Sequence, residues 1–313
     1  MNAPNRSNRG DDRMRKQSDR FIHKALAALD EGNWLKAVQF LRTAQDHDPG
    51  HLVPYHELAD IYIHIGNLDA ALAVIRDAAK IDPDDYQTNF ILANIYLIQN
   101  KPDAALKLYT KIENVFQGSS PDLLFNMALA AHALNAPEEV LAYLKRVLAE
   151  DPSYTEAFEL EAKVRFEKDD LDGAEKVLNT LLKMEPDHVL AHHLLGLVFA
   201  KCSRWEAAVR EWEEALALTP DAEETMRELA WAYNMVGNDA RAVSMLEKIL
   251  EMNPANLQAR IDLGAVFMSK SKTEEAIAQW EEARKADPNN PTVKKFLSEA
   301  RLNKGRRGSR KKK

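Results

Sequence analysis

Prolines recur through this chain at a fixed spacing of 34 residues, and that spacing restricts the fold more than any other feature. Pro49 and Pro83 show it first, and five later prolines repeat it: Pro152, Pro186, Pro220, Pro254 and Pro288. Between Pro83 and Pro152 the gap is two periods plus one residue, so one repeat has lost its proline and gained a residue. The 313 residues are therefore predicted to form an array of stacked repeats.

With each proline at position 32, the chain contains eight repeats. They begin at Ser18, Leu52, Tyr86, Pro121, Thr155, Val189, Glu223 and Leu257. Position 8 is Ala or Gly in every repeat, position 20 is Ala except at Val140, and position 24 is always large. Glycine and proline are few, and Ala, Leu, Glu and Lys are abundant, which favours helix. Each repeat is thus expected to be two helices in close contact.

This pattern, with small residues at positions 8, 20 and often 27, an aromatic at position 11 (Tyr62, Tyr96, Tyr233) and proline at 32, resembles the tetratricopeptide repeat (TPR) family. The resemblance covers residues 18–290. It implies an all-α fold, a right-handed superhelical solenoid of eight antiparallel helix pairs, with a concave groove lined by the first helix of each pair. It also implies a protein-binding scaffold. By register, Trp205, Trp212 and Trp280 are expected in the core.

The ends of the chain differ from its body. Residues 291–303 carry apolar residues at helical spacing and are predicted to form a capping helix. Residues 1–17 and 304–313 lack apolar periodicity and are expected to be a disordered basic arm and a disordered basic tail. The tail contains Arg306, Arg307, Arg310, Lys311, Lys312 and Lys313. Although the chain carries a net charge of −7, its acidic body lies between two basic ends.

No catalytic or cofactor motif is present. The sequence contains no GxGxxG, P-loop, GxSxG or HExxH pattern, and the single cysteine, Cys202, allows neither an intramolecular disulfide nor a Cys/His zinc site. We therefore expect no enzymatic activity, no cofactor and no metal. No apolar run is long enough for a transmembrane segment, and the cysteine content fits a reducing compartment, so a cytoplasmic location is expected.

In the TPR family the groove is lined by positions 2, 5, 6, 9, 12 and 13. In this sequence those positions hold eleven acidic residues but only Lys163, Lys201 and Arg227 as bases. Four of the acids, at Glu57, Asp60, Glu156 and Glu159, are taken as an acidic groove rim. A negative concavity should attract cationic segments.

Repeats 3 and 4 differ, because their groove positions are mostly apolar. We assign the peptide-binding groove to Phe90, Ile91, Asn94, Leu97, Phe125, Asn126 and Leu129. Asn94 and Asn126 match two asparagines of the carboxylate clamp of one TPR subfamily, but Phe90, Glu156 and Leu160 replace its bases. The resemblance therefore extends only to hydrogen bonds with a peptide backbone. The alternative is that these aromatic side chains pack on neighbouring helices.

Three functional hypotheses follow. The first is a non-enzymatic adaptor that binds a basic and apolar protein or peptide segment in its groove. The second is nucleic-acid or anionic-membrane binding by the basic tail, with the solenoid as recruiting arm. The third is that the basic tail occupies the acidic groove of its own or a neighbouring chain, giving autoinhibition or oligomerisation. The identity of a partner is not encoded in any motif.

Overall fold

The computed structural model describes the backbone of residues 6–310 and the side chains of residues 12–302. Over this part of the chain it contains only helices and turns, with no strand, which confirms the predicted all-α fold. The chain divides into two compact units, residues 1–157 and 158–313, and each is described separately. No helix of the described residues is long and apolar enough to cross a membrane.

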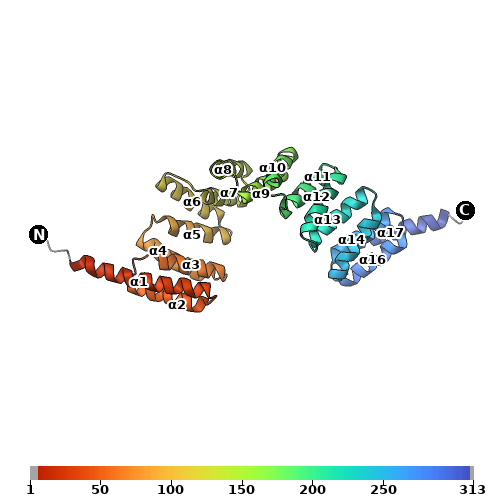
Figure 1. The fold of residues 1–313 in the computed structure, drawn as a ribbon. Helices are drawn as coiled ribbons and strands as arrows, with labels where there is room; N and C mark the ends of the chain where they lie inside the picture. Colours follow the sequence, from red (N-terminus) through yellow and green to blue (C-terminus); the bar gives the residue numbers. More distant parts are fainter. Residues whose placement is uncertain (1–5, 311–313) are drawn as a thin grey trace. The chain divides into compact units, whose positions relative to one another are not determined.

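The first unit consists of antiparallel helix pairs stacked side by side (Figure 1). Its helices are α1 (Arg6–Asp30), α2 (Trp34–His47), α3 (Val53–His64), α4 (Leu68–Ile81), α5 (Tyr86–Ile98), α6 (Pro102–Phe116), α7 (Pro121–Ala133) and α8 (Pro137–Glu150). The boundary between the units falls within α9 (Thr155–Glu167). The inserted residue lies at the end of α6, which is one residue longer than the other second helices and ends at Gln117 in the left-handed conformation.

The second unit continues the same arrangement and ends with an unpaired helix (Figure 1). Its helices are α10 (Leu171–Met184), α11 (Val189–Lys201), α12 (Trp205–Leu218), α13 (Glu223–Met235), α14 (Asp239–Met252), α15 (Leu257–Ser269), α16 (Thr273–Ala286) and α17 (Pro291–Arg310). In repeats 4 to 8 every first helix covers positions 1–13 and every second helix positions 17–30. Each of these repeats thus consists of two helices, as predicted from the proline period.

Position 15 allows the chain to turn between the two helices of each repeat. Its backbone is left-handed in all eight repeats: Gly32, Gly66, Asn100, Asn135, Asp169, Ser203, Gly237 and Ser271. Glycine, asparagine and aspartate tolerate this conformation best, and Ser203 and Ser271 adopt it as well. The following residue often caps the second helix, as when the Asn33 side chain accepts a hydrogen bond from the Lys36 amide.

The core lies between the paired helices, and it follows a size rule. Position 8 is Gly only in repeats 6 and 8, where position 24 is tryptophan. A Cβ atom on Gly196 would lie 2.4 Å from the Trp212 ring, and one on Gly264 would lie 2.3 Å from the Trp280 ring. Each buried indole N–H donates to a backbone carbonyl of the first helix, His193 or Ile261. The missing side chain thus makes the space for each indole.

The two ends of the described chain are more helical than predicted. Residues 6–17, expected to be disordered, form the first part of α1, and residues 304–310 extend α17 beyond the predicted cap of 291–303. At the amino end Ser18 is fully buried, and Arg15 lies 3.6 Å from Asp48 as an ion pair. Extending an existing helix needs no new nucleus, so apolar periodicity was too strict a criterion. Residues 1–5 and 311–313 lie outside the described part.

Candidate functional site

In the first unit, the groove face of repeat 3 is largely engaged within the fold. The Phe90 ring stacks on Tyr86 and meets the edge of the buried Tyr109 ring, with centroid distances of 5.9 and 6.0 Å. The Tyr109 hydroxyl donates to Asn94 Oδ1 at 2.5 Å. Ile91 is only 2% exposed and belongs to a core cluster with residues of the preceding repeat. Its assignment to the groove is therefore corrected: Ile91 lies in the core, because burying an apolar side chain stabilises the folded protein.

The groove face of repeat 4 is less enclosed. Phe125 lies beside the Tyr154 ring at 5.1 Å, and Asn126 and Leu129 are half-buried, as is Leu97 of repeat 3. These side chains could contact a ligand with their remaining surface. Their role in binding stays a proposal.

The four carboxylates assigned to the acidic groove rim lie in different environments. Burial raises the pKa of Glu57, and burial together with the neighbouring Glu57 charge raises the pKa of Asp60 to about 6. Glu156 is exposed, whereas Glu159 lies 3.0 Å from the His188 ring. Part of the negative charge counted from sequence is therefore weakened or paired near neutral pH.

Replacing Asp60 with Asn should stabilise the protein at pH 7.5 by up to about 1 kcal/mol, a limit set by solvent screening of this partly exposed group. The sign follows from the raised pKa: the folded state holds the proton more tightly, so the ionised carboxylate is a cost that grows as pH rises from about 4 to 6. Urea unfolding of both proteins at pH 4.0 and 7.5 tests this. A benefit of the same size at both pH values would contradict the assignment.

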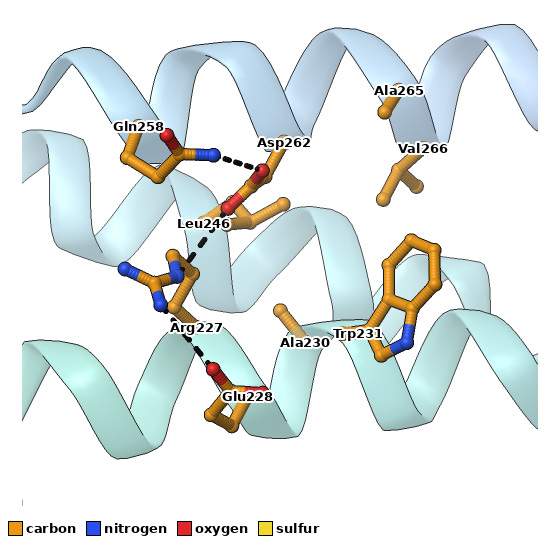
Figure 2. A pocket seen from close by; sticks show the side chains of 9 residues that line it. All are labelled: Arg227, Glu228, Ala230, Trp231, Leu246, Gln258, Asp262, Ala265 and Val266. Carbon is orange, nitrogen blue, oxygen red and sulfur yellow. Dashed lines mark hydrogen bonds and ion pairs between the residues drawn. The ribbon is translucent and has the colours of Figure 1, made fainter.

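In the second unit, a pocket of about 300 Å³ opens on the groove face of repeats 7 and 8. It is lined by Arg227, Glu228, Ala230, Trp231, Leu246, Gln258, Asp262, Ala265 and Val266. Figure 2 shows the Trp231 indole standing from α13 toward Ala265 and Val266 of α15. The indole is 48% exposed, unlike Trp212 and Trp280, which lie in the core as predicted. Leu190 and Met235, also at groove positions, are 43% and 45% exposed.

An ion network forms the polar end of this pocket (Figure 2). Arg227 places Nε 3.5 Å from Asp262 Oδ2 and donates from Nη2 to Glu228 Oε1 at 3.2 Å. Gln258 donates to Asp262 Oδ1 at 2.8 Å, and burial raises the pKa of Asp262. Two carboxylates therefore share one guanidinium, which leaves the polar end with excess negative charge beside an exposed aromatic face. We call these residues together the Trp231 pocket.

Sequence reasoning missed this pocket, although the signal was present. Trp231 occupies position 9, one of the six groove positions, and is the largest side chain at any of them. The binding site was instead assigned to repeats 3 and 4, because their groove positions are mostly apolar. In repeat 3 the Phe90 ring packs against Tyr86 and Tyr109 within the fold. In contrast, the small Ala265 opposite Trp231 leaves the indole uncovered.

Among the described residues, no group of three His, Cys, Asp or Glu side chains is arranged to hold a metal ion. The histidines instead join neighbouring helices. His56 Nε2 lies 2.8 Å from Thr88 Oγ1, and His193 Nδ1 lies 2.9 Å from Thr225 Oγ1, in the same register of two different repeats. The His64 ring stacks on Trp34. Cys202 is exposed.

Comparison with known sequences agrees with this geometry. A family profile described as "Tetratricopeptide repeat" matches residues 28–88, 128–198 and 236–300, and a second profile with the same description matches residues 92–155. The chain belongs to the tetratricopeptide repeat family. TPR repeats typically build binding scaffolds rather than active sites, with extended surfaces that neighbouring repeats share.

Curated relatives are distant and mostly longer. Human protein O-mannosyl-transferase TMTC3 is 26% identical over 229 residues, which is 72% of this chain and 25% of that protein. The Arabidopsis thaliana protein CTR9 homolog is 23% identical over 70% of this chain and 21% of its own length. The TPR repeat-containing protein YpiA of Bacillus subtilis is 22% identical over 75% of this chain and 56% of its own length. The chain thus spans about a quarter or less of the first two relatives.

Solved structures share the fold at low sequence identity. PilW, described as a type IV pilus biogenesis factor, aligns with a TM-score of 0.61 at 20% identity, over 68% of this chain and 96% of PilW. The C-terminal part of a TPR repeat-containing protein from Cytophaga hutchinsonii aligns with a TM-score of 0.64 at 14% identity, over 77% of this chain and 99% of that structure. These similarities establish the repeat fold and nothing further.

Proposed function

We propose that this TPR protein is a non-enzymatic scaffold that binds an extended protein segment on the groove face of repeats 6 to 8. The observation that carries the proposal is the exposed indole of Trp231 beside a pocket with excess carboxylate. Exposed tryptophans at a concave surface are typical energetic centres of protein interfaces. The single cysteine favours a reducing compartment, and we place this activity in the cytoplasm.

The pocket chemistry defines the segment. An aliphatic or aromatic side chain would lie against Trp231, Ala265 and Val266, which are apolar. A neighbouring lysine or arginine would pair with Glu228 and Asp262, whose two charges Arg227 only partly balances. Exposed Leu190 and Met235 extend the apolar surface along the same groove face. An acidic segment would be repelled there.

Repeats 3 and 4 provide a second proposed contact surface, now restricted to Phe90, Asn94, Leu97, Phe125, Asn126 and Leu129. The acidic residues Glu57, Asp60, Glu156 and Glu159 would add a steering charge for the same cationic ligand. The Trp231 pocket, with its exposed indole beside two carboxylates, is the primary candidate.

A selection from a random peptide library tests the proposal. We expect the recovered peptides to carry an apolar residue next to Lys or Arg, and Trp231→Ala to weaken their binding at least about tenfold, the loss of a typical hot spot. The matched control is Trp34→Ala, because Trp34 is 38% exposed and occupies position 17, which is not one of the six groove positions. Recovery of acidic peptides, or equal binding by the wild type and Trp231→Ala, would overturn the proposal.

A further inference from the structure

Helix α17 occupies the place of the first helix of a ninth repeat, and it is unusually long. Pro291 falls 34 residues after Leu257, and Val293, Leu297 and Ala300 are buried against repeat 8. All eight preceding first helices end at position 13, but α17 passes that position at Asn303 and continues to Arg310. The extra seven residues extend the helix by about 10 Å, at 1.5 Å per residue. Figure 1 shows this extension running past the helix pairs of the second unit.

The extension coincides with the most cationic part of the sequence. Residues 304–313, the predicted basic tail, have the sequence KGRRGSRKKK, with seven Arg or Lys and no acid. We call this segment the C-terminal arm. The arm begins where the other first helices turn back toward their partners. Because α17 continues as one helix to Arg310, these residues do not turn back as the chain does after the other first helices.

The arm matches the Trp231 pocket in chemistry. Arginine guanidinium groups stack on exposed indoles and pair with carboxylates, and Trp231, Glu228 and Asp262 provide both kinds of partner on one face. Glu224, also exposed, lies one turn before Glu228 on α13. The acidic body of the chain disfavours a phosphate polymer as the partner of this arm.

We propose that the C-terminal arm of one copy binds the Trp231 pocket of a second copy, so that the chain self-associates head to tail. The inference rests on the proposed function, because it assigns an occupant to the same pocket. The arm and the pocket are different surfaces, and so the contact is heterologous and copies can add repeatedly. A segment that binds the pocket from another protein would compete with the arm.

Two full-length variants with reversed charge test the proposal. The arm variant replaces Arg306, Arg307, Arg310, Lys311, Lys312 and Lys313 with Glu, and the pocket variant carries Glu224→Lys and Glu228→Lys. In sedimentation velocity at 50 mM NaCl, we expect the average mass of the wild type to rise with concentration and to fall back to the monomer at 500 mM NaCl. Each variant alone should remain monomeric. An equimolar mixture should associate, because each arm then meets a pocket of opposite charge.

Other outcomes would contradict the proposed self-association. A wild type that stays monomeric, or variants that stay monomeric when mixed, would overturn the self-association. If the wild type does not associate but binds a 20-nucleotide RNA, and the arm variant loses that RNA binding, the arm is a nucleic-acid-binding segment and the proposal is wrong. If the arm variant still binds the selected peptides through Trp231, the proposed function stands and only this inference fails.

Discussion

Replacing Gly196 with Ala is expected to destabilise the protein by about 2 kcal/mol, the size of overpacking in a close-packed core. Helix propensity alone predicts the opposite, a gain of up to about 1 kcal/mol for Gly to Ala. Packing decides, because the new Cβ would lie 2.4 Å from the ring of Trp212, which is fully buried and held by its bond to the His193 carbonyl. Guanidinium unfolding monitored by circular dichroism measures the change.

Repeats 5 and 7 provide the control for this prediction. There the corresponding pairs are Ala162 with Leu178 and Ala230 with Leu246. The double variant Gly196→Ala, Trp212→Leu reproduces that pairing. It should therefore be destabilised less than the sum of the two single changes, by a coupling of at least about 1 kcal/mol, as expected for residues in contact. Strict additivity would show that position 8 does not set the space for position 24.

The second large effect is a loss of stability in mild acid. Burial lowers the pKa of His51, His56 and His193, so the folded state favours the neutral rings. Their stabilising contribution is present above pH 6.5 and is lost as pH falls toward the lowered values, because the unfolded chain then binds more protons. Each ring is hydrogen-bonded to a buried hydroxyl of a neighbouring helix: Ser18, Thr88 and Thr225 respectively.

The variant His56→Gln, His193→Gln isolates this effect. Between pH 7.5 and 5.5 the wild type should lose about 1 kcal/mol more unfolding free energy than the variant, a figure discounted for the partial exposure of both rings. Asp60, Glu57 and Asp262 have raised pKa values and act in the opposite direction, but they are present in both proteins and cancel. If the unfolding free energy of the two proteins changes equally with pH, these histidines do not make the stability of the protein depend on pH.

The architecture was predictable because one period controls several independent residues. Proline at position 32, the left-handed residue at position 15 and the small residue at position 8 all follow the same 34-residue count, so the helix boundaries could be read from sequence. The exception lay at the ends, which lie outside the 34-residue period. There α1 and α17 continue as helices because extension of an existing helix is cheap.

The site was harder to predict, because exposure depends on neighbours that a period does not specify. Ile91 and Trp231 both occupy groove positions, yet Ile91 is buried in a core cluster and Trp231 stands uncovered opposite Ala265. Asn94 is a suitable hydrogen-bonding side chain by type, but its amide oxygen already accepts from Tyr109. Residue type and register give candidates, and side-chain packing selects among them.

Photo-crosslinking to a selected basic, apolar peptide tests the central claim most directly. A photoreactive amino acid is placed in turn at Ala265, in the Trp231 pocket, and at Leu129, on the groove face of repeat 4. If the pocket is the binding site, the peptide crosslinks from position 265, and Trp231→Ala abolishes that crosslink. Crosslinking from position 129 and not from position 265 would contradict the account and assign binding to repeats 3 and 4.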